Sequence, residues 1–139
     1  MVIEGYASRF SQADLNDDVM MKGAFADSLM RSGAGGIRML YQHQTKAVIG
    51  VWDEVVEDGA GLFVRGRILD VTPEARMARA LVRSGAIDGL SIGFRTVKSR
   101  RQGRLRVLAQ VDLWEVSVVT FPMLTTARIM RVAEDMAAA

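Results

Sequence analysis

The chain has 139 residues and a formal net charge of +2, with 50% hydrophobic and 24% charged residues. These values are typical of one soluble globular domain, so we expect a single domain over residues 1–139. The absence of cysteine excludes disulfides and thiolate chemistry, and the single histidine, His43, argues against a zinc site, so we expect no metal and no cofactor. No apolar run is long enough to span a membrane and the N-terminus has no apolar signal core, so we expect no membrane partner and no secretory signal.

The first half of the chain predicts a strand-rich region with one short helix. Leu62, Val64 and Ile68 alternate with Arg65 and Arg67, which is typical of a strand with one buried face. Turn-forming residues before this strand predict a hairpin. The predicted elements are a strand at 2–10, a loop at 11–18, a helix at 22–32, a strand at 37–42, and hairpin strands at 47–57 and 62–69 around a turn at 58–61.

The second half begins with the clearest helix signal. Thr72 can cap a helix, Pro73 suits its first position and Gly85 is a usual helix end, so we expect a helix over about residues 73–84. The elements predicted beyond it are strands at 90–97, 104–110 and 111–121, a turn at 98–103 and a helix at 125–134. Strands that do not alternate regularly with helices predict a mainly β, α+β fold, in the form of an antiparallel β-barrel or sheet with peripheral helices.

Three polar residues occupy positions where a site could form. His43 follows a predicted strand, and histidine has an unperturbed pKa of about 6.5, which suits proton transfer near neutral pH. Ser91 lies among small and apolar residues, where a substrate backbone can approach closely. Glu115 interrupts an apolar strand pattern, and a carboxylate there needs a partner, which an arginine or the imidazole could provide. Spacing alone does not connect the three residues, and each also fits an ordinary structural role.

Four segments, taken in order, resemble the prohead proteases of tailed bacteriophages and of phage-derived gene transfer particles. Each motif is weak alone, but together they extend over nearly the whole chain. The segments are Gly5-Tyr-Ala-Ser-Arg-Phe10 with Asp17-Asp18 and Gly23-Ala-Phe25, then Met39-Leu-Tyr-Gln-His43-Gln, then Ser84-Gly-Ala-Ile-Asp-Gly-Leu-Ser91-Ile-Gly-Phe94, and then Leu113-Trp-Glu115-Val-Ser-Val-Val-Thr-Phe-Pro122.

The resemblance implies a serine endopeptidase with a fold related to the herpesvirus assembly proteases, which is a β-barrel surrounded by helices. The chain order in those enzymes is histidine, serine and a third orienting residue, which here gives His43, Ser91 and Glu115. Ser91 would attack a peptide carbonyl, His43 would take and return its proton, and Glu115 would orient the imidazole. Asp112 is an alternative third member, although on a regular strand it faces the opposite side from Glu115. Backbone N–H groups near residues 122–124 are a candidate source of oxyanion stabilisation.

The resemblance also implies the substrate and the place of reaction. The substrate would be the scaffolding segment of the major capsid protein, and the protease often cleaves itself as well. Cleavage would take place in the host cytoplasm, inside the assembling prohead and before DNA packaging. The implied assembly is a homo-oligomer, with no cofactor.

Two alternative functions remain open at the level of the sequence. The first is a nucleic-acid-binding β domain, because basic residues around the predicted turn could contact phosphates. These residues are Lys98, Arg100, Arg101, Arg104 and Arg106. The turn carries no aromatic residue for base stacking, so nucleic acid is not the favoured partner. The second alternative is a catalytically silent capsid-assembly factor with the same fold.

Overall fold

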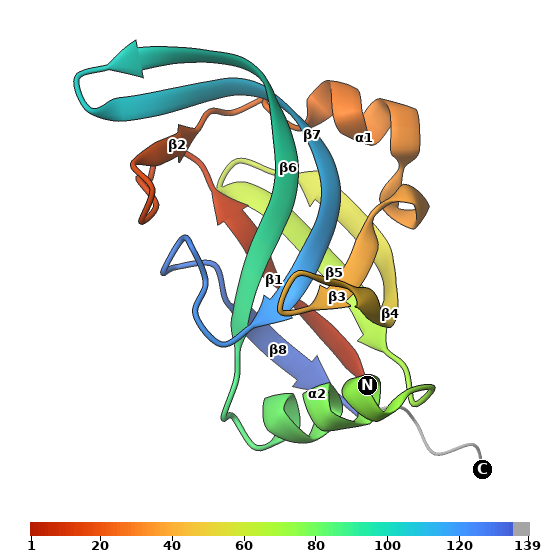
Figure 1. Ribbon diagram of the computed structural model, residues 1–139. Coiled ribbons are helices and arrows are strands. Elements are labelled where there is room, and N and C mark those ends of the chain that lie inside the picture. The colour runs from red at the N-terminus through yellow and green to blue at the C-terminus, as the bar shows by residue number, and fades with distance from the viewer. Residues whose placement is uncertain (135–139) are drawn as a thin grey trace.

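Most of the chain forms one curled β-sheet with two helices outside it (Figure 1). The computed structural model describes residues 1–134. The strands are β1 (Val2–Arg9), β2 (Asp18–Met20), β3 (Arg38–Tyr41), β4 (Gln44–Glu57), β5 (Gly61–Ile68), β6 (Gly89–Gln102), β7 (Leu105–Val119) and β8 (Ile129–Ala133). The helices are α1 (Ala26–Ser32), α2 (Pro73–Arg83) and the short 3-10 helix η1 (Ala34–Gly36). The predicted mainly β class is therefore confirmed.

Strand β7 organises the sheet because it pairs with three other strands. One edge of β7 is antiparallel to β6, and its other edge is parallel to β3 and to β2. From β3 the sheet continues through antiparallel pairs to β4, β5, β1 and β8. The sheet is thus mostly antiparallel, as expected, and the parallel pair β3–β7 brings two segments that are distant in sequence side by side.

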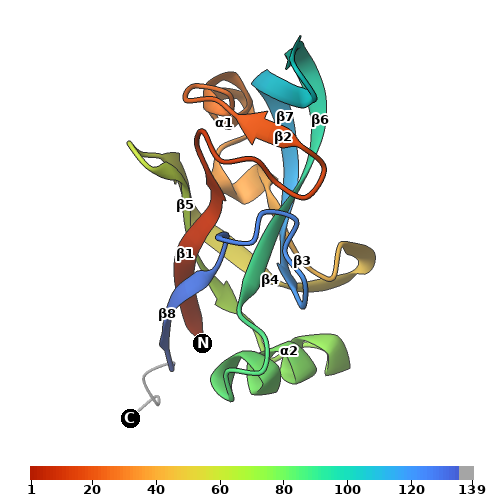
Figure 2. The same ribbon diagram turned by 90° about the vertical axis from the view of Figure 1, so that its left-hand side faces the viewer.

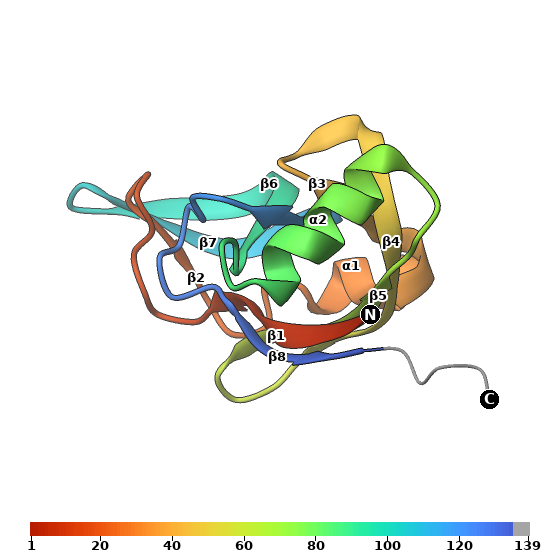
Figure 3. The same ribbon diagram turned by 90° about the horizontal axis from the view of Figure 1, so that it is seen from below.

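The sheet curls until its two ends meet at the start of β6. Gly89 forms an isolated bridge with Arg128, and the N–H of Leu90 donates to the carbonyl of Ala127 at 2.9 Å. Figure 2 shows β1, β5 and β8 on one side of the curl and β6 and β7 on the other. Helix α2 lies across one end of the curled sheet (Figure 3). This closure surrounds the apolar core, against which the site residues are positioned.

The core consists of apolar side chains from the strands and from α2, and Leu29 of α1 packs against it. Leu62, Val64 and Ile68 on β5 are fully buried whereas Arg65 and Arg67 are exposed, which confirms the predicted alternation. Other large side chains that are fully buried are Met1, Ile3, Phe25, Met39, Ile49, Leu90, Leu108, Val111 and Val116. Within residues 1–134, no helix has the length and apolarity to span a membrane.

Helix α2 forms where the sequence predicts it. The hydroxyl of Thr72 accepts a hydrogen bond from the N–H of Ala75 at 3.1 Å, and Pro73 is the first helical residue. The chain leaves the helix at Gly85, whose φ of 77° lies in the left-handed region that glycine adopts without strain. Local signals at both ends therefore decide the extent of this helix.

The β6–β7 hairpin is longer than predicted. The predicted turn at 98–103 is too long, because β6 continues to Gln102, and the predicted break between residues 110 and 111 is wrong, because β7 runs through these positions. Gly103, with a φ of 62°, and Arg104 form the two-residue turn, as in a type II′ hairpin. The polar run before Gly103 is a strand because this part of the hairpin projects from the sheet and is exposed on both faces, so it shows no apolar alternation.

Two predicted helices differ from the structure because distant residues decide the local conformation. The predicted helix at 125–134 is wrong: β8 lies there instead and completes the edge of β1. The predicted helix at 22–32 is shortened to α1. The N–H groups of Gly23 and Phe25 donate to the carboxylate of Glu57 at 3.1 and 2.9 Å, and these contacts hold a turn before the helix.

Candidate active site

His43 lies in a strained hairpin turn between β3 and β4. Tyr41 and Gln44 pair across the turn, and the two residues between them, Gln42 and His43, have φ values of 53° and 60°. A type I′ turn requires such values at both central positions, which usually carry glycine or asparagine. The left-handed conformation costs other residues roughly 1–2 kcal/mol each. Backbone strain of this kind persists only where surrounding contacts hold it.

Four hydrogen bonds to β7 and the residue after it hold the turn. The backbone N–H of Gln42 donates to the carbonyl of Val118 at 3.0 Å. The side-chain amide of Gln42 donates to the hydroxyl of Thr120 at 2.6 Å and accepts a hydrogen bond from the N–H of Thr120 at 3.1 Å. The N–H of His43 donates to the hydroxyl of Ser117 at 3.0 Å. Sequence reasoning did not identify Gln42, Ser117 or Thr120 as site residues, because their roles depend on the pairing of β3 with β7.

Glu115 binds the imidazole of His43. The ring Nδ1 donates to Glu115 Oε2 at 2.5 Å, while Glu115 Oε1 accepts a hydrogen bond from the hydroxyl of Ser117 at 2.6 Å. Ser117 is fully buried and Glu115 is 9% exposed. Both carboxylate oxygens are therefore held, and the imidazole is oriented with Nδ1 toward Glu115. Among residues 1–134, nothing is hydrogen-bonded to the other ring nitrogen, Nε2, which can therefore take a different partner.

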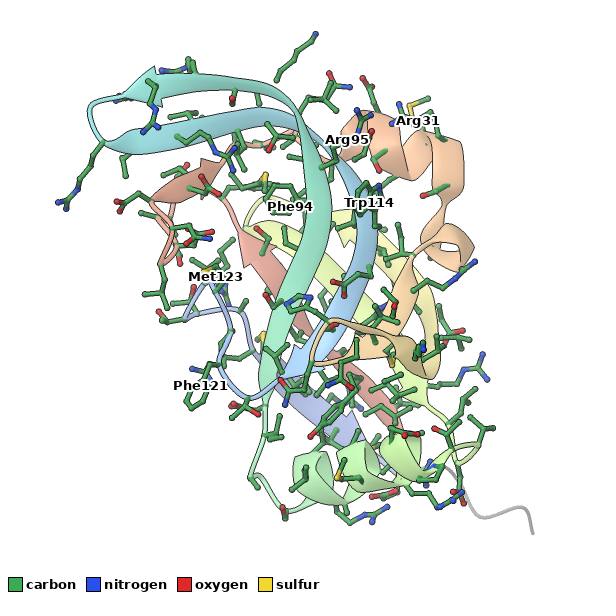
Figure 4. All side chains as sticks on the ribbon, in the orientation of Figure 1. Arg31, Phe94, Arg95, Trp114, Phe121 and Met123 are labelled. Atoms are coloured by element: carbon green, nitrogen blue, oxygen red, sulfur yellow. The ribbon has the colours of Figure 1, made fainter. Side chains whose placement is uncertain are left out.

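An irregularity in β7 lies directly beside Glu115. Gly93 on β6 is the cross-strand partner of Glu115, but the next pair along the hairpin is Phe94 with Leu113. Trp114 is consequently the extra residue of a β-bulge, and its side chain is 58% exposed. Figure 4 shows Trp114 on β7 across from Phe94 on β6. Bulges re-aim neighbouring side chains, and this one sets the direction in which Glu115 leaves the strand.

Ser91 lies on β6, next to the residues that hold His43. Its cross-strand partner is Ser117, and Ser91 itself is 6% exposed. Ser91 and His43 both line a cleft of about 280 Å³, together with Met123 and Leu124. In the described part of the chain, residues 1–134, no hydrogen bond joins Ser91 to His43. The structure thus brings the three predicted residues into one neighbourhood and bonds two of them directly.

The bond to Glu115 changes the acidity of His43. This hydrogen bond raises the pKa of the imidazole above its ordinary value of 6.5, because it favours the protonated ring. Partial burial of the ring opposes the shift, and the charge of the carboxylate adds to it. The hydrogen bond is the largest of these effects. A histidine adjusted in this way accepts a proton more readily than an isolated one.

Asp112, the alternative third residue, is bound elsewhere. Its carboxylate accepts hydrogen bonds from Arg95 at 2.5 Å and from Arg31. These arginines reach it from β6 and from α1 (Figure 4). The bond from Arg95 and the charges of both arginines lower the pKa of Asp112. Glu115 rather than Asp112 therefore contacts His43.

The cleft extends from Ser91 to a polar end at the base of the β6–β7 hairpin. Thr96 and Arg106 line that end, and Arg106 donates two hydrogen bonds to the carboxylate of Asp18, at 2.8 and 2.9 Å. The charge of Asp18 is therefore balanced within the protein. Across residues 1–134, no cluster of three or more histidine, aspartate or glutamate side chains could hold a metal ion.

A profile of the caudovirus prohead serine protease family matches residues 1–139, the whole length of the chain. The chain belongs to this family. The prohead protease of Enterobacteria phage HK97 is 34% identical to it over 126 residues, which cover 87% of this chain and 55% of the relative. The chain thus spans about half the length of this curated relative. The family resemblance predicted from the four motifs is confirmed.

The fold of this prohead protease family member is similar to solved structures of phage and herpesvirus proteases. The bacteriophage T4 capsid assembly protease matches with a TM-score of 0.67 at 15% identity, covering 85% of this chain and 80% of that one. KSHV protease, solved in complex with a hexapeptide phosphonate inhibitor, matches with a TM-score of 0.61 at 12% identity, covering 96% of this chain and 65% of that one. At such identities the similarity concerns the fold alone, and it confirms the predicted herpesvirus-protease-like architecture.

Proposed function

We propose that the chain is a serine endopeptidase in which Ser91 is the nucleophile, His43 the general base and Glu115 the orienting carboxylate. The observation that carries the proposal is the 2.5 Å bond between His43 Nδ1 and Glu115 Oε2. It fixes the ring tautomer that leaves Nε2 ready to take a proton, in a cleft that Ser91 also lines. Membership of a serine protease family supports this chemistry and does not favour the alternative of a nucleic-acid-binding domain.

The mechanism follows from these positions. Ser91 Oγ attacks the carbonyl carbon of the scissile peptide bond while its proton passes to Nε2 of His43. The imidazolium that forms is stabilised by Glu115 and later protonates the leaving amine. Water then attacks the acyl-enzyme with His43 again as the base. The bond from Ser91 to His43 forms when substrate orders the site, since catalytic hydrogen bonds are often long before substrate binds.

The tetrahedral oxyanion needs N–H donors, and we assign them to the loop after β7. Met123 and Leu124 line the cleft together with Ser91. Among the bonds of residues 1–134, none uses the N–H of Met123 or of Leu124. Loss of one oxyanion donor in a protease typically costs about 2.7–4 kcal/mol of transition-state stabilisation.

The substrate class follows from the family and from the shape of the site. Beyond Leu90, strand β6 pairs only with β7 among the described strands, so its second edge offers backbone groups to an extended peptide. We assign the scaffolding segment of the major capsid protein as this peptide, with self-cleavage as a second reaction. The location is the assembling prohead in the host cytoplasm. A homo-oligomer remains a prediction, which sedimentation analysis of the purified chain would test.

One experiment tests the proposed function. The chain is co-expressed with the major capsid protein from the same genome, and capsid cleavage is followed by mass spectrometry. We expect Ser91→Ala and His43→Ala to abolish cleavage while the far-UV circular dichroism stays unchanged. Ser99→Ala, which changes an exposed serine on the same strand, is the matched control and retains cleavage.

A labelling experiment identifies the nucleophile independently. A fluorophosphonate probe reacts with activated serine hydroxyls, and we expect it on the peptide that contains Ser91. Labelling should disappear in His43→Ala. Capsid cleavage that persists in folded Ser91→Ala, or labelling at another serine, would overturn the assignment. Absence of any cleavage by the wild-type chain would favour the catalytically silent assembly factor.

A further inference from the structure

The outer half of the β6–β7 hairpin projects from the body of the protein as a two-stranded arm (Figure 1). We define the arm as residues 98–106. Strand β2, which pairs with β7 at residues 106–108, supports its base. Figure 4 shows nitrogen-ended side chains projecting from the outer part of the arm. No residue of the arm belongs to the buried core, so the arm contributes little to stability. Its projecting shape and its positive charge therefore suggest a role in binding.

The protein neutralises the cations at the base of the arm but not those at its tip. Arg106 forms an ion pair with Asp18, and Arg95, which precedes the arm on β6, forms an ion pair with Asp112. The tip carries four exposed cations that have no carboxylate within 4.0 Å anywhere in residues 1–134. These are Lys98, Arg100, Arg101 and Arg104. Like charges held close together destabilise a hairpin, so this cluster favours an external anionic partner.

The arm continues the catalytic cleft. Thr96 and Arg106, at its base, line the same cleft as Ser91. Arg101 is the cross-strand partner of Arg106, so the two side chains lie on the same face of the hairpin. Strand residues advance by about 3.3 Å, so an extended peptide in the cleft would reach Lys98 to Arg101 roughly seven to ten residues from the bond at Ser91.

We propose that the arm is an exosite that binds an acidic segment of the polypeptide substrate, roughly seven to ten residues from the scissile bond. This inference rests on the proposed protease function. The partner is a polypeptide because the arm extends the groove through which the peptide substrate runs. Nucleic acid is not favoured, since residues 98–106 include no aromatic side chain on which bases could stack.

The experiment compares two substrates and two double variants. The substrates are intact capsid protein and a short peptide that spans its mapped cleavage site but cannot reach the arm. Arg101→Gln/Arg104→Gln removes two charges from the arm. Arg76→Gln/Arg83→Gln removes two from α2, at the other end of the molecule, where both arginines form exposed ion pairs. We expect the arm variant to lower kcat/KM for intact capsid protein about tenfold, with little change for the short peptide.

The control variant should cleave both substrates at the wild-type rate. Moving the acidic segment of the capsid protein to the other side of the scissile bond should also lower kcat/KM, because the arm lies at one end of the cleft. Equal cleavage of intact capsid protein by the wild type and the arm variant would overturn the exosite while leaving the protease intact. Loss of cleavage by the wild type itself would instead overturn the proposed function. Inhibition of capsid cleavage by a short DNA duplex, relieved in the arm variant, would identify the arm as a nucleic-acid site and overturn the proposal.

Discussion

A Cβ atom at Gly93 would lie 2.2 Å from Oε2 of Glu115, the oxygen that binds His43. The missing side chain at Gly93 therefore provides the space in which the carboxylate meets the imidazole. No contact of this kind surrounds Gly59, where an added Cβ would meet nothing within 4 Å. Glycine is thus required at Gly93 for the geometry of the site, although its backbone conformation is that of an ordinary strand residue.

Gly93→Ala should reduce activity far more than stability. The added methyl group displaces the Glu115 side chain, and misplacement of a catalytic group by about 1 Å can cost about 100-fold in rate. We expect kcat for capsid cleavage to fall by about that factor, while the thermal melting curve stays close to that of the wild type. Gly59→Ala is the matched control and should retain full activity. Wild-type kcat in Gly93→Ala would show that the Glu115 contact is dispensable.

Ser117→Ala tests the support of the carboxylate. The substitution removes the hydroxyl that bonds Glu115 Oε1 and leaves the N–H of His43 without its acceptor. The buried Glu115 Oε1 then lacks its hydrogen bond, and an unsatisfied buried polar group costs about 1–3 kcal/mol, so the free energy of unfolding should fall by that amount. Activity should fall as well, because the hydroxyl of Ser117 helps to hold the Glu115 carboxylate in the orientation in which it binds His43. Urea unfolding and kcat/KM measure the two effects, and an unchanged value of either would contradict the role given to Ser117.

The single histidine makes the pH dependence directly measurable. In the proposed mechanism His43 must be neutral to accept a proton, and its bond to Glu115 raises the pKa of the ring, so kcat/KM should rise with pH through a midpoint above 6.5. Glu115→Gln removes the charge that favours the imidazolium, so the midpoint should move to lower pH. The only imidazole C2–H resonance in the proton NMR spectrum should report the same pKa. A midpoint that does not move in Glu115→Gln would refute the coupling.

The same bond makes a pH-dependent contribution to stability. The pKa of His43 is higher in the folded than in the unfolded chain, so protonated His43 stabilises the fold. This contribution is complete below the unfolded value of 6.5 and is lost as the pH rises through the folded pKa. Glu115→Gln should therefore lower the free energy of unfolding more at acid pH than at alkaline pH. Chemical denaturation at both pH values measures the difference, and an equal or opposite change would refute it.

Gln42 and Thr120 form a second testable pair. Gln42→Ala removes both side-chain amide hydrogen bonds that hold the strained turn, whereas Thr120→Val removes only the bond to the hydroxyl and keeps the one from the backbone N–H. Because the two residues bind each other, the effects on kcat/KM should be less than additive in the double variant. Gln42→Gly also loses the side-chain amide, but glycine adopts the left-handed turn without strain. We therefore expect Gln42→Gly to be more stable than Gln42→Ala but no more active. Full additivity in the double-mutant cycle would mean that the pair does not act as a unit.

Local sequence signals decided the elements whose causes lie within a few residues. Thr72, Pro73 and Gly85 set the ends of α2, and the alternation around Arg65 set the faces of β5. The same reasoning fails where a distant group takes over. Glu57 holds the backbone before α1 in a turn. The segment predicted as a helix at 125–134 instead contains β8, because it pairs with the edge of β1.

The sequence by itself determined the residue types available for chemistry, the mainly β class and, through four motifs in order, the family. It named His43, Ser91 and Glu115 but did not connect them through spacing. Only the tertiary structure shows the hydrogen bond between His43 and Glu115 and the cleft that His43 shares with Ser91. Hydrogen bonding between the parallel strands β3 and β7 places the His43 turn against Ser117, and the bulge opposite Gly93 directs Glu115 to the ring. Pairing between segments far apart in the chain depends on the free energy of the whole fold, which no local pattern of residues encodes.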